Sequence, residues 1–428
     1  MELTLMLCDG NFMAKMIRKF MAFGMFLTLL LPSAAFAAEG HVMGLSFLGI
    51  RVEFVLFGLV LLGIALFHHR TFSIAVAGLI AIGVFKLCCT SFDIPAHLHR
   101  ELKGLLNLFG LLMGFAILAR HFEESRAPEA LPRWLPSGWL GGFVLLWMVF
   151  VLSSFLDNIA AAMIGGTIAM VVFKRNVHIG YFAAIVAASN AGGAGSVVGD
   201  TTTTMLWIGG ANAFDVFRAY AGAVIALAVC GTVAARQQDK LQPLTSAGDT
   251  RVAVDWGRLL IVALMLVGAI IANILTRFPS AGLWLAIFVG AMFRKTAWRE
   301  LVGAAKGSLF FVALVLCSSM MPVDALPAPT WQTTFGMGFV SAFAGTIPFT
   351  KLALVQGGYD WGFVAYAVGF GGSIIWFGSS AGVALANIFP QCRSVRSWLR
   401  DGWHVPLAYV IGFGVMLLVM GWHPHALR

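Results

Sequence analysis

Residues 188–206 read ASNAGGAGSVVGDTTTTML and interrupt a long apolar region of the chain. The four glycines in this stretch weaken a helix, because glycine gives up the most conformational freedom on folding. Asp200 adds a carboxylate that has apolar sequence on both sides. Irregular backbone at membrane depth is tolerated only where protein buries it or where it lines a wet cavity. We therefore expect an interrupted membrane helix that binds an ion or a small polar solute.

The composition predicts an all-α polytopic membrane protein. The chain is 60% hydrophobic and 11% charged, and its mean hydropathy of +0.89 exceeds what a soluble fold can bury. Its length allows about ten spans of roughly 20 residues each. The net charge of +9 comes largely from Lys and Arg in short loops between apolar runs, which set orientation. We expect a bacterial-type inner membrane location, with the lipid bilayer as partner and no nucleic acid.

Residues 1–37 have the features of a signal peptide. A basic start is followed by the apolar run FMAFGMFLTLLL, and Ala35-Phe36-Ala37 matches a cleavage site. The alternative is an uncleaved first span.

Charge placement and run lengths predict two repeats of inverted topology. The first covers residues 45–236, a cytoplasmic linker covers 237–256, and the second covers 257–422. We expect each repeat to contain three spans, a re-entrant helical hairpin, a broken transmembrane helix and a closing span. Paired interruptions in two inverted halves predict a transport site near the membrane midplane.

The first hairpin carries SSFLDN near its tip, at residues 153–158. Asp157 and Asn158 offer hard oxygen ligands and Ser154 offers a hydroxyl, a set that suits an alkali cation better than a soft metal. A carboxylate here can hold either a proton or a cation, so we expect Asp157 and Asp200 to bind sodium. Alternatively, each aspartate caps the helix that follows it.

Three further features leave alternatives open. Asn190 is either a ligand or a structural hydrogen bonder. Threonine hydroxyls often bond back to the helix, so only part of the run 201–204 should face the site. Lys351 lies three positions after Pro348, close to the expected tip of the second hairpin. It is a counter-ion for Asp157 or Asp200, a contact for an anionic solute, or a side chain that snorkels to the surface.

The motifs ASNAGGAGSVVGDTTTTMLWIGG and SSFLDN resemble those of NhaD-type sodium/proton antiporters. These belong to the ion transporter superfamily, with citrate, dicarboxylate and arsenite carriers. The resemblance covers most of residues 45–422 in layout and is specific at the first hairpin and the first broken helix. It implies an elevator-like fold of inverted repeats, often a homodimer. It also implicates Asp157, Asn158, Asn190, Asp200, Thr202 and Thr203 in ion binding.

The second half departs from that pattern. The family usually shows an aspartate–asparagine pair before the proline, where this chain reads SAFAGTIPFTK with Gly345 and Thr346. Ser341 and Ser373 still match the family, and we expect them and Thr346 to contribute to the site. One acidic ligand is therefore missing, and Lys351 has appeared nearby.

The favoured function is sodium or lithium exchange for protons by alternating access, with no cofactor and no enzymatic activity. The alternative is a carrier of a small anion such as citrate, a dicarboxylate or arsenite, in which Lys351 meets the solute. Asp200 favours the first function and Lys351 the second.

Overall fold

The computed structural model describes residues 46–47, 50–66, 70–130, 133, 135–244 and 253–427. The signal peptide expected in residues 1–37 lies outside these ranges. Two short strands, β1 (Ser46–Phe47) and β2 (Ile50–Arg51), pair antiparallel. The other regular elements of the described chain are helices, as the composition predicts.

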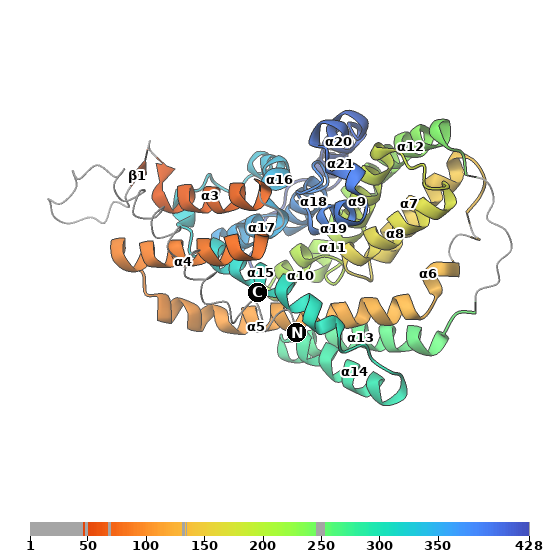
Figure 1. The fold of residues 1–428 in the computed structure, drawn as a ribbon. Helices are drawn as coiled ribbons and strands as arrows, with labels where there is room; N and C mark the ends of the chain where they lie inside the picture. Colours follow the sequence, from red (N-terminus) through yellow and green to blue (C-terminus); the bar gives the residue numbers. More distant parts are fainter. Residues whose placement is uncertain are drawn as a thin grey trace, which may run out of the picture.

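Six helices pack mainly on one another and form what we call the first helix group (Figure 1). They come from the start and the middle of the chain: α3 (Val52–Leu66), α4 (Thr71–Cys89), α5 (Ile94–Glu124), α13 (Trp256–Thr276), α14 (Pro279–Phe293) and α15 (Glu300–Ser319). The short α6 (Ala127–Ala130) follows α5. In Figure 1, α5, α13 and α14 lie together along one edge of the molecule.

The remaining helices form the second helix group, which contains the motifs singled out above. Its members are α7 (Trp139–Ser153), α8 (Asn158–Val172), α9 (Ile179–Ala194), α10 (Thr201–Ile208), α11 (Ala213–Phe217), α12 (Ala219–Leu241), α16 (Trp331–Ala344), α17 (Thr346–Gln356), α18 (Trp361–Gly371), α19 (Ser380–Ile388), α20 (Val395–Asp401) and α21 (His404–Met420). Two 3₁₀ turns, η3 (Val323–Ala325) and η4 (Pro390–Arg393), lie in connections. The two groups meet where α17 packs on α15, α10 on α5 and α16 on α3.

The described helices identify a multi-pass membrane protein. Five of them are long and apolar enough to cross a membrane, or six if α20 and α21, bent by 57°, count as one span. Several shorter apolar helices, among them α8 and α9, accompany them. Helix α5 starts at Ile94, because Asp93 accepts a hydrogen bond from Ala96 N and a proline occupies the first turn.

Burial differs strongly between the two groups. Nearly every residue of α9 and every residue of α18 is buried, whereas the first group exposes many large apolar side chains, such as Leu275 and Met292. Exposed apolar surface on membrane helices is suited to lipid. The fold thus surrounds the two interrupted helices with protein.

Candidate functional site

The interruption predicted in residues 188–206 falls between α9 and α10. Helix α9 ends at Ala194 and α10 begins at Thr201. Two threonine hydroxyls hold the irregular segment: Thr203 donates to the Ser196 carbonyl at 2.6 Å, and Thr204 donates to the Val197 carbonyl at 3.0 Å. Thr203 is therefore structural in this conformation, since it stabilises the loop backbone.

The first hairpin packs directly against this interrupted helix. A Cβ on Gly192 would collide with the Phe150 carbonyl, and one on Gly199 with the Ser153 carbonyl, so only glycine allows this approach. Two serine hydroxyls of the hairpin bond to the same interrupted helix. Ser153 donates to the Ser189 carbonyl at 2.6 Å, and Ser154 donates to the Gly192 carbonyl at 3.2 Å. Ser154 thus anchors the hairpin to α9.

Four side chains from four helices or their connections form what we call the polar cluster. Asn158 Nδ2, at the start of α8, donates to Asn190 Oδ1 at 3.0 Å and to Asp200 Oδ1 at 2.9 Å. Asn190 Nδ2 then donates to the hydroxyl of Ser373 at 2.9 Å. All four side chains are buried. The structure therefore brings together residues of the first hairpin, the first broken helix and the second broken helix, all predicted from the sequence.

Three oxygens at this cluster lack a hydrogen bond to any described residue: Asp200 Oδ2, Asn158 Oδ1 and the Thr202 hydroxyl. The Thr202 hydroxyl lies close enough to the Asp200 carboxylate to interact with it electrostatically, although their geometry falls short of a hydrogen bond. Asp200 Oδ2 lies 3.7 Å from where a Cβ on Gly369 would be. Buried polar atoms without partners are uncommon and call for an explanation. A carboxylate, an amide oxygen and a hydroxyl are the hard ligands that an alkali cation prefers.

Asp157 is the residue immediately before α8, and its side chain makes no capping hydrogen bond. Asp200 likewise precedes α10 without a side-chain cap. Both carboxylates nevertheless lie close to the first backbone N–H groups of the helix that follows, so each can favour the start of its helix as well as face the cluster. Asp157 is half-buried and close enough to Asp200 for the two charges to interact, so an added cation would relieve their repulsion.

The second hairpin contributes less to the cluster. Ser341 donates to the carbonyls of Gly338 (2.9 Å) and Val368 (3.2 Å), so it ties α16 to α18. Thr346 begins α17, and its methyl group lies against Gly372 at the end of α18. Both residues lie beside the second broken helix, and neither is hydrogen-bonded to the four side chains of the polar cluster.

Lys351 is not a counter-ion for Asp157 or Asp200, and that expectation is wrong. Its Nζ forms an ion pair with Glu101 Oε2 of α5 at 2.7 Å. The side chains are largely buried, so Lys351 does not snorkel to the surface either. The expectation failed because Glu101 lies 250 positions away, on the other helix group.

Several buried polar groups were not predicted from the sequence. Glu53 is fully buried and pairs with Lys86 at 3.1 Å, and Tyr220 donates to the Gly192 carbonyl beside the hairpin at 3.0 Å. Trp398 approaches the site through its indole nitrogen, 3.4 Å from the Ser373 carbonyl. A lone Glu in the first turn of an apolar helix could have been noticed. Tyr220 and Trp398 carry no such signal.

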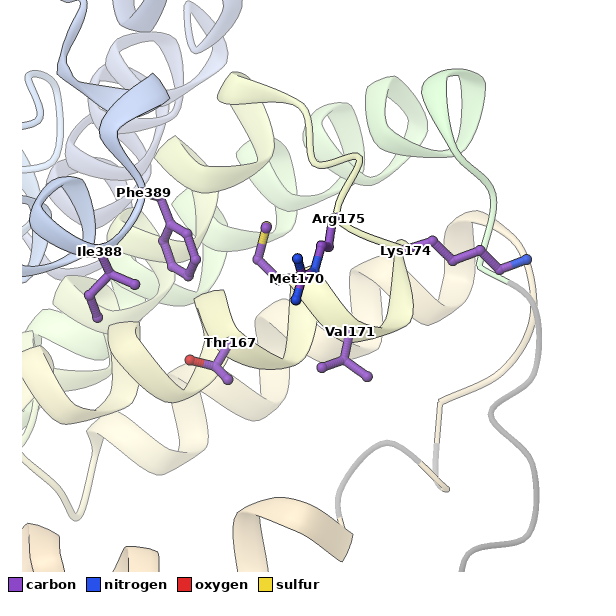
Figure 2. Close-up of a pocket in the computed structure, with 7 residues that line it drawn as sticks. All are labelled: Thr167, Met170, Val171, Lys174, Arg175, Ile388 and Phe389. Carbon is purple, nitrogen blue, oxygen red and sulfur yellow. The ribbon is translucent and has the colours of Figure 1, made fainter.

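A surface groove of about 610 Å³ lies away from the polar cluster, at the far ends of α8 and α19. Figure 2 shows Met170, Arg175 and Phe389 along it, with Lys174 extending away from the others. Its lining includes none of the cluster residues.

Curated relatives of the chain are named as sodium/proton antiporters. The Na(+)/H(+) antiporter NhaD of Alkalimonas amylolytica is 27% identical over 78% of this chain and 81% of its own length. The NhaD of Vibrio parahaemolyticus is 26% identical over 68% of this chain and 84% of its own. Sodium/proton antiporter 1 of Arabidopsis thaliana is 27% identical over 67% of this chain and 56% of its own. No family model matches the chain. The resemblance to the NhaD type is confirmed at this modest level of identity.

Proposed function

We propose that this chain, a relative of the NhaD-type sodium/proton antiporters, itself exchanges sodium or lithium for protons. One observation carries the proposal: the buried Asp200 carboxylate has an oxygen without a partner, next to two further unpartnered oxygens from Asn158 and Thr202. Together with Asp157, these groups offer two negative charges and neutral oxygen ligands in one place.

Exchange follows when a cation and a proton compete for the same carboxylates. A bound sodium ion favours the ionised form of Asp157 and Asp200, and its departure in a buried setting favours protonation. Asn158 positions Asp200 through the 2.9 Å hydrogen bond, and Asn190 holds Asn158 in place. Because protons occupy the site at low pH, the sodium concentration for half-maximal exchange should rise as pH falls, by up to about tenfold per pH unit.

The architecture expected from the sequence is part of the proposal. The order of α7–α12 parallels that of α16–α21: two helices joined by a short connection, an interrupted helix, then a long closing helix. This order supports two inverted repeats (45–236 and 257–422) with re-entrant hairpins and about ten spans in a bacterial inner membrane. Alternating access would come from movement of the second helix group against the first, in a monomer or a homodimer. No cofactor or catalytic step is needed.

An anion carrier is not favoured. The three relatives compared above are named for sodium and protons, and Lys351 is neutralised by Glu101 rather than free to meet a solute at the polar cluster.

Proton movement in everted membrane vesicles, followed by a pH-sensitive dye, tests the proposal. Addition of sodium or lithium chloride should release protons, and Asp157→Asn and Asp200→Asn should each prevent the release. Immunoblots must show equal amounts of each protein in the membrane. No response to either cation, or a response retained in both variants, would overturn the proposal.

A further inference from the structure

A pocket of about 310 Å³ lies where the two helix groups meet. Helices α5 and α15 line it on one side and α10 and α17 on the other. We call it the boundary pocket, and its polar lining comprises Arg100, Glu101, Lys103, Asn107, Arg277 and Lys351.

The lining of the boundary pocket is positively charged. Glu101 and Lys351 neutralise each other across a 2.7 Å contact. No described carboxylate forms an ion pair with Arg100, Lys103 or Arg277, the remaining charged residues of the lining. Three cations therefore remain uncompensated around one hollow.

A buried donor without a partner lies in the same pocket. Asn107 is only 1% exposed. Its Oδ1 accepts a hydrogen bond from Ser280 N at 3.0 Å, which fixes the orientation of the amide. Its Nδ2 lacks a hydrogen bond to any described residue. Because this nitrogen is itself closed off from the hollow, it adds a partial positive charge behind the lining rather than a direct contact for a ligand.

We propose that the boundary pocket binds an anionic phosphate group, supplied by a phospholipid headgroup or by free phosphate. Phosphate accepts several hydrogen bonds at once, and guanidinium groups such as those of Arg100 and Arg277 match its geometry. The pocket is much larger than one water molecule, whose share of the liquid is about 30 Å³, and a halide ion would use few of the available donors.

The phosphate group is not the transported ion. No residue of the polar cluster lines the boundary pocket. Along α10, Met205 is the lining residue nearest to Asp200 in sequence, five residues beyond it, which corresponds to about 7.5 Å of helix. The bound group would instead bridge the two helix groups, because Arg277 belongs to one side and Lys351 to the other.

Thermal unfolding of the purified full chain in detergent tests this proposal without measuring transport. Sodium phosphate is compared with sodium chloride at equal pH, sodium concentration and ionic strength. In a second arm, phosphatidylglycerol is compared with the phosphate-free lipid digalactosyldiacylglycerol. A ligand that binds only the folded state raises the unfolding midpoint, and we expect a rise of at least about 2 °C.

Three variants make the test specific. Asn107→Asp keeps the acceptor for Ser280 N but replaces the free donor with a negative charge, and Arg277→Gln removes an exposed cation. Each should lose at least half of the rise, whereas Lys306→Gln, an exposed cation on α15 outside the pocket, should keep it.

The two arms separate the sources of the phosphate group. A rise with inorganic phosphate identifies the free anion, and a rise with phosphatidylglycerol alone identifies a lipid headgroup. No rise in either arm would overturn the proposal, as would a full rise in Arg277→Gln. Because Arg277→Gln changes only an exposed side chain, the test stands even if Asn107→Asp does not fold.

Discussion

Each of the two hairpins of the second helix group consists of two helices joined by a short turn, but the turn of the first is charged and the turn of the second is neutral. The first, α7 and α8, carries Asp157 and Asn158 at its turn and places an amide between Asn190 and Asp200. The second, α16 and α17, turns through Gly345 and Thr346. Its nearest charge, Lys351, is paired with another helix. The first hairpin therefore supplies charge to the second helix group, whereas the second hairpin supplies neutral backbone and hydroxyl groups.

The largest effect on sodium binding should come from the carboxylate of Asp200. Asp200→Asn removes the carboxylate but keeps a side chain that can bond to Asn158. Loss of a charge from a buried ion site costs about 2 kcal/mol or more, or about 30-fold in affinity. We expect the affinity for sodium, measured by direct binding of radioactive sodium to the purified protein, to fall at least that far, because proton release itself is lost in this variant.

Asp324→Asn is the matched control, because that carboxylate is exposed and lies in a connection outside the site. Equal losses in both variants would mean that Asp200 has no special role.

Placing an aspartate at the turn of the second hairpin should not make that turn equivalent to the turn of the first. Gly345 has φ 86° and ψ 157°, a region that essentially only glycine occupies. A Cβ there would meet no neighbour, so strain alone should destabilise Gly345→Asp, by about 1–3 kcal/mol. Thermal unfolding should show a lower midpoint for Gly345→Asp than for the native chain.

Thr346→Asn is the companion variant, since residue 346 is the first of a helix and lies outside that restricted region. It should unfold near the native temperature. A Gly345→Asp protein as stable as the native one would show that the second turn can adopt another backbone conformation.

A smaller effect is expected from the ion pair that ties the second hairpin to α5. Lys351→Met leaves the Glu101 carboxylate partly buried without a partner, which should cost about 1–3 kcal/mol of stability. Adding Glu101→Gln should recover most of this loss, because the double variant buries no lone charge. Chemical denaturation of four proteins, the native chain, Lys351→Met, Glu101→Gln and the double variant, measures the coupling. Additive losses would show that the two side chains do not depend on each other.

The smallest effect should come from Gly369→Ala, a substitution on α18 beside the carboxylate of Asp200. The new methyl group would lie 3.7 Å from Asp200 Oδ2 and 3.6 Å from the Cβ of Ala194, ordinary contact distances. Stability should change little, by less than about 1 kcal/mol. Sodium affinity should fall a few-fold, because the methyl group takes space next to the free carboxylate oxygen. A change in stability without a change in affinity would separate Gly369 from the ion site.

Local sequence features predicted the interrupted helix and three residues of the polar cluster, Asn158, Asn190 and Asp200, whereas Ser373 was expected from the resemblance to the family. Glycines, Asp200 and the threonines lie within one short stretch, so their departure from apolar helical sequence is visible without the fold. Pairing between distant helices is not visible in this way. Nothing near Lys351 points to Glu101, and nothing near Asn107 shows that its amide would bond to the start of α14.

The end of a helix is harder to predict from the sequence than its apolar centre. Residues 94–101 are too polar to look like membrane sequence, yet they extend α5, because a cap at Asp93 and a proline in the first turn start the helix early. The geometry of Gly345 was equally hidden, since a glycine in a sequence does not reveal the sign of its φ angle.

The hydrogen bond from Asn190 to Ser373 joins residues 183 positions apart, and this separation has a consequence for biosynthesis. At about 5–20 residues per second, the ribosome needs roughly 10–40 s to make Ser373 after Asn190. During that interval the first half of the chain must hold Asn190, Asn158 and Asp200 in the membrane before their last partner exists. The nascent protein therefore passes through a stage at which its most polar interior is incomplete, and a stall in translation between these residues would prolong its exposure to quality-control proteases.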